Sequence, residues 1–120
     1  MAEHNEFGQK GEETAARYLT GIGYQILERN WRFEKQEIDI IAKDGEYLVI
    51  VEVKTRSSSF FGDPAEAVKW KKRKGLVRAA DAYVNLKNIP SEVRYDIISI
   101  IREGDREKIR HITDAFYPTL

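Results

Sequence analysis

The chain has 120 residues with twenty basic and twenty acidic side chains, which fits one domain of ordinary size with no net formal charge. It contains no cysteine, which excludes disulfides, thiolate catalysis and cysteine-based zinc sites. No apolar run approaches the roughly 18 residues that cross a membrane, and the polar start does not resemble a secretory signal. We therefore expect a single cytoplasmic domain over residues 1–120 without membrane contact.

The balanced charge is unevenly distributed along the chain. Residues 54–78 carry eight basic and two acidic side chains, whereas residues 1–53 carry six basic and eleven acidic ones. A basic block on a neutral chain indicates either a polyanionic partner or a solvated helix face, and the charge pattern fits both interpretations.

The spacing of apolar residues predicts a first helix over about residues 6–20, which ends at Gly21 and Gly23. Residues 24–33 form a first predicted strand. Strands over 37–42 and 47–54 follow, and the Asp-Gly pair between them is typical of a hairpin turn. The third strand is apolar on both faces, which predicts a central strand covered on both sides.

The residues from Asp63 to Glu66 predict the start of a second helix, which reaches about Leu86. A fourth strand over 93–101 and a weaker fifth over 108–112 follow. Because a helix joins the third and fourth strands, we expect these strands to be parallel, with a right-handed crossover. The element order predicts an α/β domain with a mixed central sheet flanked by helices, and not a simple doubly wound parallel sheet.

Charged residues occupy the second and third strands where the pattern otherwise predicts a core. If Asp44-Gly45 forms the turn, Glu37 faces Glu52, and Asp39 lies diagonal to Glu52 on the same face. Lys54 shares that face. Buried like charges cost several kcal/mol each unless they are neutralised, and a hard cation such as Mg²⁺ prefers oxygen ligands of this kind. Lys54 would then neutralise charge or position a water. The alternative is an exposed hairpin end, at which Lys54 pairs with Glu52.

The second predicted helix combines a basic face with a basic residue inside its apolar stripe. Lys72 occupies one position of the stripe, so its side chain must either extend to solvent or meet an acid. Basic residues surround Trp70 on the other face: Lys69, Lys71, Arg73, Lys74 and Arg78. Such a mixture of cations and an aromatic ring suits a phosphate backbone, while the alternative is that Trp70 packs against the protein.

An acid on the first helix, then Asp39, then Glu52-Val53-Lys54, in this element order, resembles the PD-(D/E)xK nuclease superfamily. That superfamily has the restriction-endonuclease-like αβββαβ core and includes archaeal Holliday junction resolvases. The whole chain is similar to the YraN family of predicted endonucleases. The matching segments include Gly8-Gln9-Lys10-Gly11-Glu12, Glu37-Ile38-Asp39-Ile40-Ile41-Ala42, Val51-Glu52-Val53-Lys54-Thr55-Arg56 and Ile112-Thr113-Asp114-Ala115-Phe116. One departure is Gln36, where the family usually has Gly.

The resemblance implies a metal-dependent nuclease that acts on DNA, with branched or damaged DNA among its candidate substrates. Asp39 and Glu52 would bind Mg²⁺ or Mn²⁺, and Lys54 would assist the attacking water. Glu12 would be the helical acid, with Glu13 as the alternative. DNA would contact a set of basic residues: Arg56, Lys69, Lys71, Lys72, Arg73 and Lys74. The alternatives are a non-catalytic nucleic-acid-binding module on the same fold and an interaction protein with a vestigial site, and a homodimer stays open.

Overall fold

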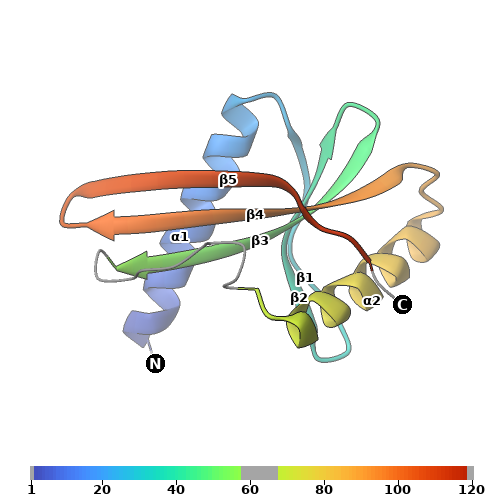
Figure 1. Ribbon diagram of the computed structural model, residues 1–120, viewed down its shortest axis with the longest axis horizontal. Helices are drawn as coiled ribbons and strands as arrows, with labels where there is room; N and C mark the ends of the chain where they lie inside the picture. The colour runs from blue at the N-terminus through green and yellow to red at the C-terminus, as the bar shows by residue number, and fades with distance from the viewer. Residues whose placement is uncertain (1, 58–67, 119–120) are drawn as a thin grey trace.

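The computed structural model describes residues 2–57 and 68–118. The elements in chain order are α1 (Ala2–Gly21), β1 (Gln25–Phe33), β2 (Gln36–Asp44), β3 (Tyr47–Ser57), α2 (Trp70–Lys87), β4 (Glu92–Glu103) and β5 (Arg106–Phe116). Figure 1 shows a twisted sheet with α1 crossing it and α2 lying beside the end of β5. Neither helix of the described chain has the length and apolar character needed to span a membrane.

The five strands form one sheet in the order β1-β2-β3-β4-β5. Neighbouring strands are antiparallel except β3 and β4, which are parallel. The predicted mixed α/β sheet is therefore confirmed, as are the central position of β3 and its parallel pairing with the strand after the second helix.

Alternate residues of β3 pack against different helices, which explains why this strand is apolar on both faces. Val49 and Val51 belong to the core cluster that contains residues of α1, whereas Leu48 and Ile50 belong to the cluster that contains residues of α2. All four side chains are at most 2% exposed. Full burial of such a side chain stabilises the fold by about 1.5–3 kcal/mol, so β3 anchors both layers.

The hairpin between β2 and β3 differs from the predicted one by one residue in its turn. Asp44 pairs with Tyr47, so the two-residue loop is Gly45-Glu46 and not Asp44-Gly45. Gly45 has a φ of +58°, which the first position of such a loop requires. The predicted register was therefore wrong by two residues. Because a shift of two keeps each side chain on its face, the predicted grouping of the charged residues is unaffected.

Element ends also differ from the predicted ones. Helix α1 begins earlier than predicted, at Ala2, and β4 and β5 are each longer than predicted. The prediction of one continuous helix from Asp63 was wrong, because Lys69 has extended backbone with φ −73° and ψ 159°. Asp63 and Glu66 lie outside the described residues. At the observed start of α2, Arg73 donates from its backbone N–H to Lys69 O at 3.0 Å and from Nε to Val68 O at 2.7 Å.

Candidate active site

The candidate site lies where β2 separates from β3. The pairing of these strands covers Ile40–Asp44 with Tyr47–Val51, while β3 continues to Ser57 beside β4 and the first residues of β2 stay beside β1. We call this place the strand fork (Figure 1). At the fork the backbone N–H of Val53 donates to Asp39 Oδ2 at 2.8 Å. Because the strands diverge here, the Asp39 carboxylate accepts the hydrogen bond that a backbone carbonyl of a paired strand would otherwise accept.

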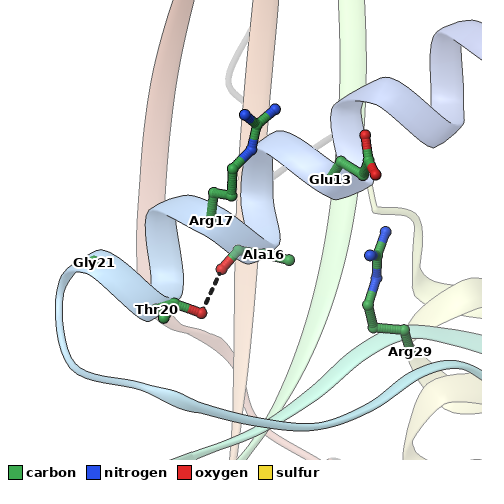
Figure 2. A pocket seen from close by; sticks show the side chains of 6 residues that line it. All are labelled: Glu13, Ala16, Arg17, Thr20, Gly21 and Arg29. Carbon is green, nitrogen blue, oxygen red and sulfur yellow. Dashed lines mark hydrogen bonds between the residues drawn. The ribbon is translucent and has the colours of Figure 1, made fainter.

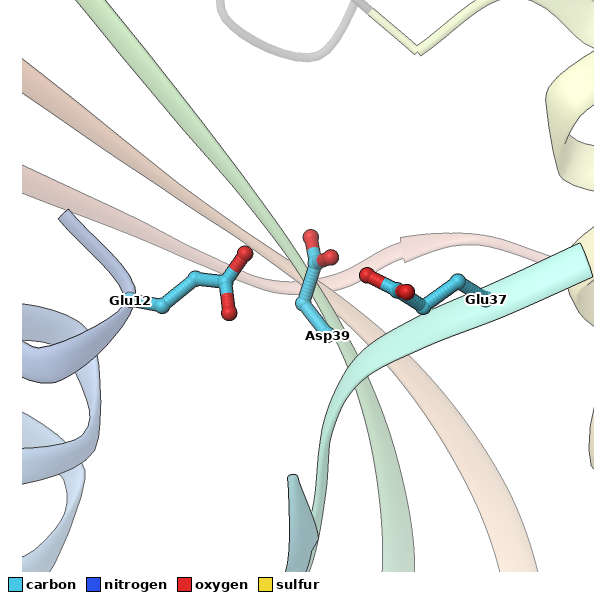
Figure 3. A group of neighbouring side chains, drawn as sticks. All are labelled: Glu12, Glu37 and Asp39. Carbon is cyan, nitrogen blue, oxygen red and sulfur yellow. The ribbon is translucent and has the colours of Figure 1, made fainter. Parts of the chain in front are cut away.

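Three carboxylates converge beside the fork from two elements. Glu12 of α1 and Glu37 and Asp39 of β2 each offer one oxygen, and these oxygens lie within 4.8 Å of one another. Figure 3 shows Glu12 and Glu37 pointing toward Asp39 from opposite sides. Oxygen donors at this spacing suit a hard divalent cation.

The structure also distinguishes the two candidate acids of α1, which line one hollow together, because Glu12 belongs to the carboxylate cluster. Glu13 is exposed and lines a hollow of about 590 Å³ between α1 and β1. Figure 2 shows Glu13 and Arg29 on facing sides of this hollow, with the hydrogen bond from Thr20 to Ala16 at its far end. Glu12, and not Glu13, is therefore the helical acid at the fork.

Gly11 explains how α1 comes close enough to deliver Glu12. A Cβ atom at Gly11 would overlap Thr55 Oγ1 and lie 3.2 Å from Thr55 Cβ. A side chain here would push the helix away from β3, and Glu12 would move with it. Glycine in the middle of a helix costs about 1 kcal/mol relative to alanine. At Gly11 this cost is offset by the close approach of α1 to β3 at Thr55.

Glu52 is the most deeply buried acid of the site, at 3% exposed. Its Oε2 lies 3.6 Å from Lys54 Nζ and 3.8 Å from Lys72 Nζ. Lys72 thus meets an acid, which was one of the two outcomes that the sequence left open. Within residues 2–57 and 68–118, Glu52 Oε1 is buried without a hydrogen-bond partner. A buried acceptor without a partner costs about 1–3 kcal/mol, which a cation at the fork or a proton shared with Asp39 would relieve.

The ionised form of the Asp39 carboxyl is unfavourable when no cation lies beside it. Burial, then the charge of Glu52 and a hydrogen bond with it, raise the pKa of Asp39 to about 9, although the Val53 N–H opposes the rise. At neutral pH the pair therefore retains a proton. A divalent cation would displace that proton, and the oxygen-only donor set fits Mg²⁺ or Mn²⁺.

Sequence reasoning missed Asn30 of β1. Its Nδ2 donates to Glu12 Oε1 at 2.6 Å and to Glu37 Oε1 at 3.3 Å, so one amide joins acids from two elements. Asn30 has a φ of +53°, a backbone conformation that asparagine tolerates better than most residues. Its position in an exposed stretch of β1 offered no signal, because the bend that turns its amide toward the acids is tertiary.

The predicted nucleic-acid residues divide into distinct groups. Lys69, just before α2, and Lys71 and Lys74 on α2 are exposed, whereas Lys72 faces Glu52. The half-buried Arg73 donates to Val68 O and lies 5.1 Å from the Phe116 ring centroid. The remaining member, Arg56, is half-buried on β3 beyond Lys54. The structure therefore does not bring all six together, and their contact with DNA stays a prediction.

The protein is a mixed α/β protein with a carboxylate-rich candidate site, and its five-stranded mixed sheet and two helices are compatible with a restriction-endonuclease-like core. The chain belongs to the uncharacterised protein family UPF0102, the YraN family, whose model matches residues 11–100. It is 53% identical over 120 residues to a UPF0102 protein of Bacteroides thetaiotaomicron, covering 100% of this chain and 99% of that relative. A UPF0102 protein of Christiangramia forsetii is 52% identical over 117 residues, with 98% of each chain covered. One of Flavobacterium johnsoniae is 49% identical over 121 residues, also with 98% of each covered.

Proposed function

We propose that this protein is a metal-dependent nuclease that hydrolyses DNA phosphodiester bonds at the strand fork. The observation that supports the proposal most is Glu52, a buried carboxylate that contacts Asp39 and faces two lysines. Replacing buried ion pairs by apolar residues is often neutral or stabilising, so a purely structural role explains this cluster poorly. Groups with strongly shifted pKa values, such as Asp39, are also concentrated at functional sites.

The residues divide the chemistry between them. Asp39 and Glu52 would hold Mg²⁺ or Mn²⁺, with Glu12 and Glu37 able to complete the oxygen ligands. When bound, the cation supplies charge that polarises a phosphoryl oxygen and lowers the pKa of a water. The Val53 N–H holds Asp39 in orientation through its bond to Oδ2.

Lys54 has the position that the proposed reaction needs. Its Nζ lies 3.6 Å from Glu52, and its side chain is 29% exposed, so the ammonium group is held at the site and still reaches solvent. From there it would donate a hydrogen bond to the attacking water or to a phosphoryl oxygen, and stabilise the negative charge that develops on it. Lys72 adds a second cation from α2.

The main alternative function is a module that only binds DNA, and the acidic residues of the fork argue against it. Binding to phosphates uses Lys and Arg, whereas carboxylates that face a phosphate repel it. Glu12, Glu37, Asp39 and Glu52 would weaken such a surface unless a cation lay between them and the phosphate. The acidic cluster therefore favours metal-dependent chemistry over simple binding.

The test is a cleavage assay on labelled linear, branched and single-stranded DNA with Mn²⁺, with Mg²⁺ and with chelator. We expect cleavage that requires the metal and falls about 100-fold or more in Asp39→Asn, Glu52→Gln and Lys54→Ala. Glu46→Gln is the matched control, because Glu46 is an exposed acid in the β2–β3 turn. Thermal melts confirm that each variant is folded. Absence of cleavage on every DNA by folded, metal-bound protein would favour the binding module, and wild-type cleavage by Glu52→Gln would place the chemistry elsewhere.

A further inference from the structure

A groove of about 720 Å³ lies between α2 and the end of β5. Val77, Ala115 and Phe116 supply apolar lining, and Trp70 and Tyr117 line it as well. Trp70 is 64% exposed and Tyr117 is 69% exposed. Figure 1 shows the C-terminal end of β5 running alongside α2, which brings these distant segments together. A hollow of this volume with exposed aromatic rings has the size and lining of a small-ligand site.

Cations accompany the aromatic rings of the groove. Lys74 Nζ lies 4.4 Å from the centroid of the Trp70 ring, and the Arg73 guanidinium lies 5.1 Å from that of Phe116. Arg78 and Asp81 also line the groove, but the Arg78 guanidinium is paired with Glu34 at 2.9 Å. Arg73 and Lys74, the cations that lie beside rings of the groove, make it complementary to a ligand that is both aromatic and anionic. A nucleotide has both properties, because its base stacks and its phosphate is charged.

The groove and the strand fork lie on different sides of α2. Trp70 and Lys74 are four residues apart and share one face, whereas Lys72 projects about 200° away from Trp70 and reaches Glu52 at 3.8 Å. A helix with its side chains is about 10–12 Å wide. A DNA strand that contacts both places therefore passes around this helix.

We propose that this groove binds an unpaired nucleotide of a DNA strand whose phosphodiester backbone passes the fork a few nucleotides away. The proposal rests on the proposed function and specifies its substrate class, which is DNA with a single-stranded segment such as an overhang, flap or gap. Bases inside a duplex have no free faces, so rings such as Trp70 and Tyr117 can stack only on unpaired bases.

The test measures binding in chelator, so that no cleavage occurs. The probes are a labelled oligothymidylate of about eight nucleotides and a labelled blunt duplex, and fluorescence anisotropy gives both dissociation constants. Oligothymidylate should quench tryptophan fluorescence of the wild-type protein. Trp70→Ala should weaken oligothymidylate binding about tenfold or more and duplex binding less than about twofold, and Trp70→Phe should restore most of the loss. Leu86→Ala is the control, because Leu86 is 68% exposed on the same helix and does not line the groove.

Three results would overturn the proposal. If Trp70→Ala binds oligothymidylate with wild-type affinity, the Trp70 ring does not stack on a base. If it loses as much affinity for duplex as for oligothymidylate, the groove contacts the DNA backbone in general. A change in sedimentation of Trp70→Ala with unchanged DNA affinity would make the groove an interface between two copies of the chain. Because the binding assay contains no metal, it tests the groove independently of the chemistry. Selective binding of oligothymidylate, together with no cleavage of any DNA in the separate Mn²⁺ assay, would refute the proposed nuclease while leaving the groove intact.

Discussion

Two aspartates with buried carboxylates should respond in opposite ways to the same substitution. Asp39 lies at the fork with a pKa raised to about 9. Asp96 of β4 is 0% exposed and accepts hydrogen bonds from Arg94 Nε at 3.0 Å, His111 Nε2 at 2.7 Å and the Asp114 N–H at 3.1 Å. Burial by itself raises the pKa of Asp96, but these donors lower it below its ordinary value. Asp96 is therefore held as a paired anion. The single Val53 N–H at Asp39 does not offset burial and the nearby charge of Glu52.

The two substitutions differ in the groups that the new amide faces. In Asp96→Asn an NH₂ group replaces an oxygen that accepts from several donors, so we expect a cost of about 3–5 kcal/mol, as when a buried ion pair is broken. For a chain of this length that cost lowers Tm by roughly 12–20 °C. In Asp39→Asn the amide replaces a carboxyl that is mostly protonated at neutral pH. The amide can donate toward Glu52 as the protonated carboxyl does, and it removes the cost of holding a proton that the unfolded chain has already lost, so stability should stay within about 1 kcal/mol of wild type or rise.

Thermal melts in chelator measure both effects at neutral pH. If Asp39→Asn melts as far below wild type as Asp96→Asn, Asp39 is a structural partner and the assignment of the fork as a functional site is wrong. Equal and small shifts in both variants would contradict the account of Asp96.

A pH series extends the same experiment. The folded protein retains the Asp39 proton, which the unfolded chain loses above about pH 4. The contribution of Asp39 to stability is therefore complete below about pH 4 and is lost as the pH rises toward its folded pKa of about 9. The slope for one group is at most about 1.4 kcal/mol per pH unit. Asp39→Asn should flatten the fall in stability of the wild-type protein over this range, and an identical profile would contradict the raised pKa.

Three further predictions concern the surroundings of the fork. Gly11→Ala should destabilise the protein in thermal denaturation although alanine favours helices by about 1 kcal/mol, and Thr55→Ala should relieve most of that loss. Gly8→Ala on the same helix should cause no loss, because its Cβ would meet nothing within 4 Å in the described chain. Asn30→Gly keeps the left-handed backbone but removes the amide, so calorimetry should show Mn²⁺ affinity falling about 10- to 100-fold, and unchanged affinity would exclude a positioning role. Lys71→Ala should make the log–log salt dependence of duplex binding shallower by about 0.9, whereas an unchanged slope would make Lys71 a solvated residue.

Much of the sheet was predictable because its local and global signals agree. The apolar residues on both faces of β3 predicted a central strand, and the structure places that strand between two helical layers. The turn was less predictable, since a glycine can occupy either position of a two-residue loop. The predicted start of α2 was wrong because a capping pattern such as the one at Asp63 is a local signal. It does not determine where tertiary contacts let the helix begin. There the contacts of Arg73 with Val68 and Lys69 begin the helix at Trp70.

The candidate site was predictable where it depends on strand alternation. The pattern grouped Asp39 with Glu52 and Lys54, and the structure brings these three side chains together. Glu37 was grouped with them, but its place beside Glu12 depends on how closely α1 approaches the sheet. The amide of Asn30 depends on a left-handed backbone that no sequence period reveals.

The groove beside α2 shows the same division between local and tertiary signals. The sequence singled out Trp70 among basic residues and left open whether it packs or binds, and the structure leaves this ring mostly exposed. Phe116 and Tyr117 lie more than forty residues further along the chain. Their position opposite α2 follows from the whole sheet, so no local pattern could place them in one groove.

The most direct test of the account is a Mn²⁺ titration of single-turnover DNA cleavage by wild-type protein and Asp39→Asn. We predict that the wild-type rate is zero in chelator and rises to saturation with Mn²⁺. Asp39→Asn should need at least about tenfold more Mn²⁺ and reach a rate lower by about 100-fold. Cleavage that persists in chelator, or that follows the same Mn²⁺ dependence in both proteins, would contradict catalysis by a cation held at the strand fork.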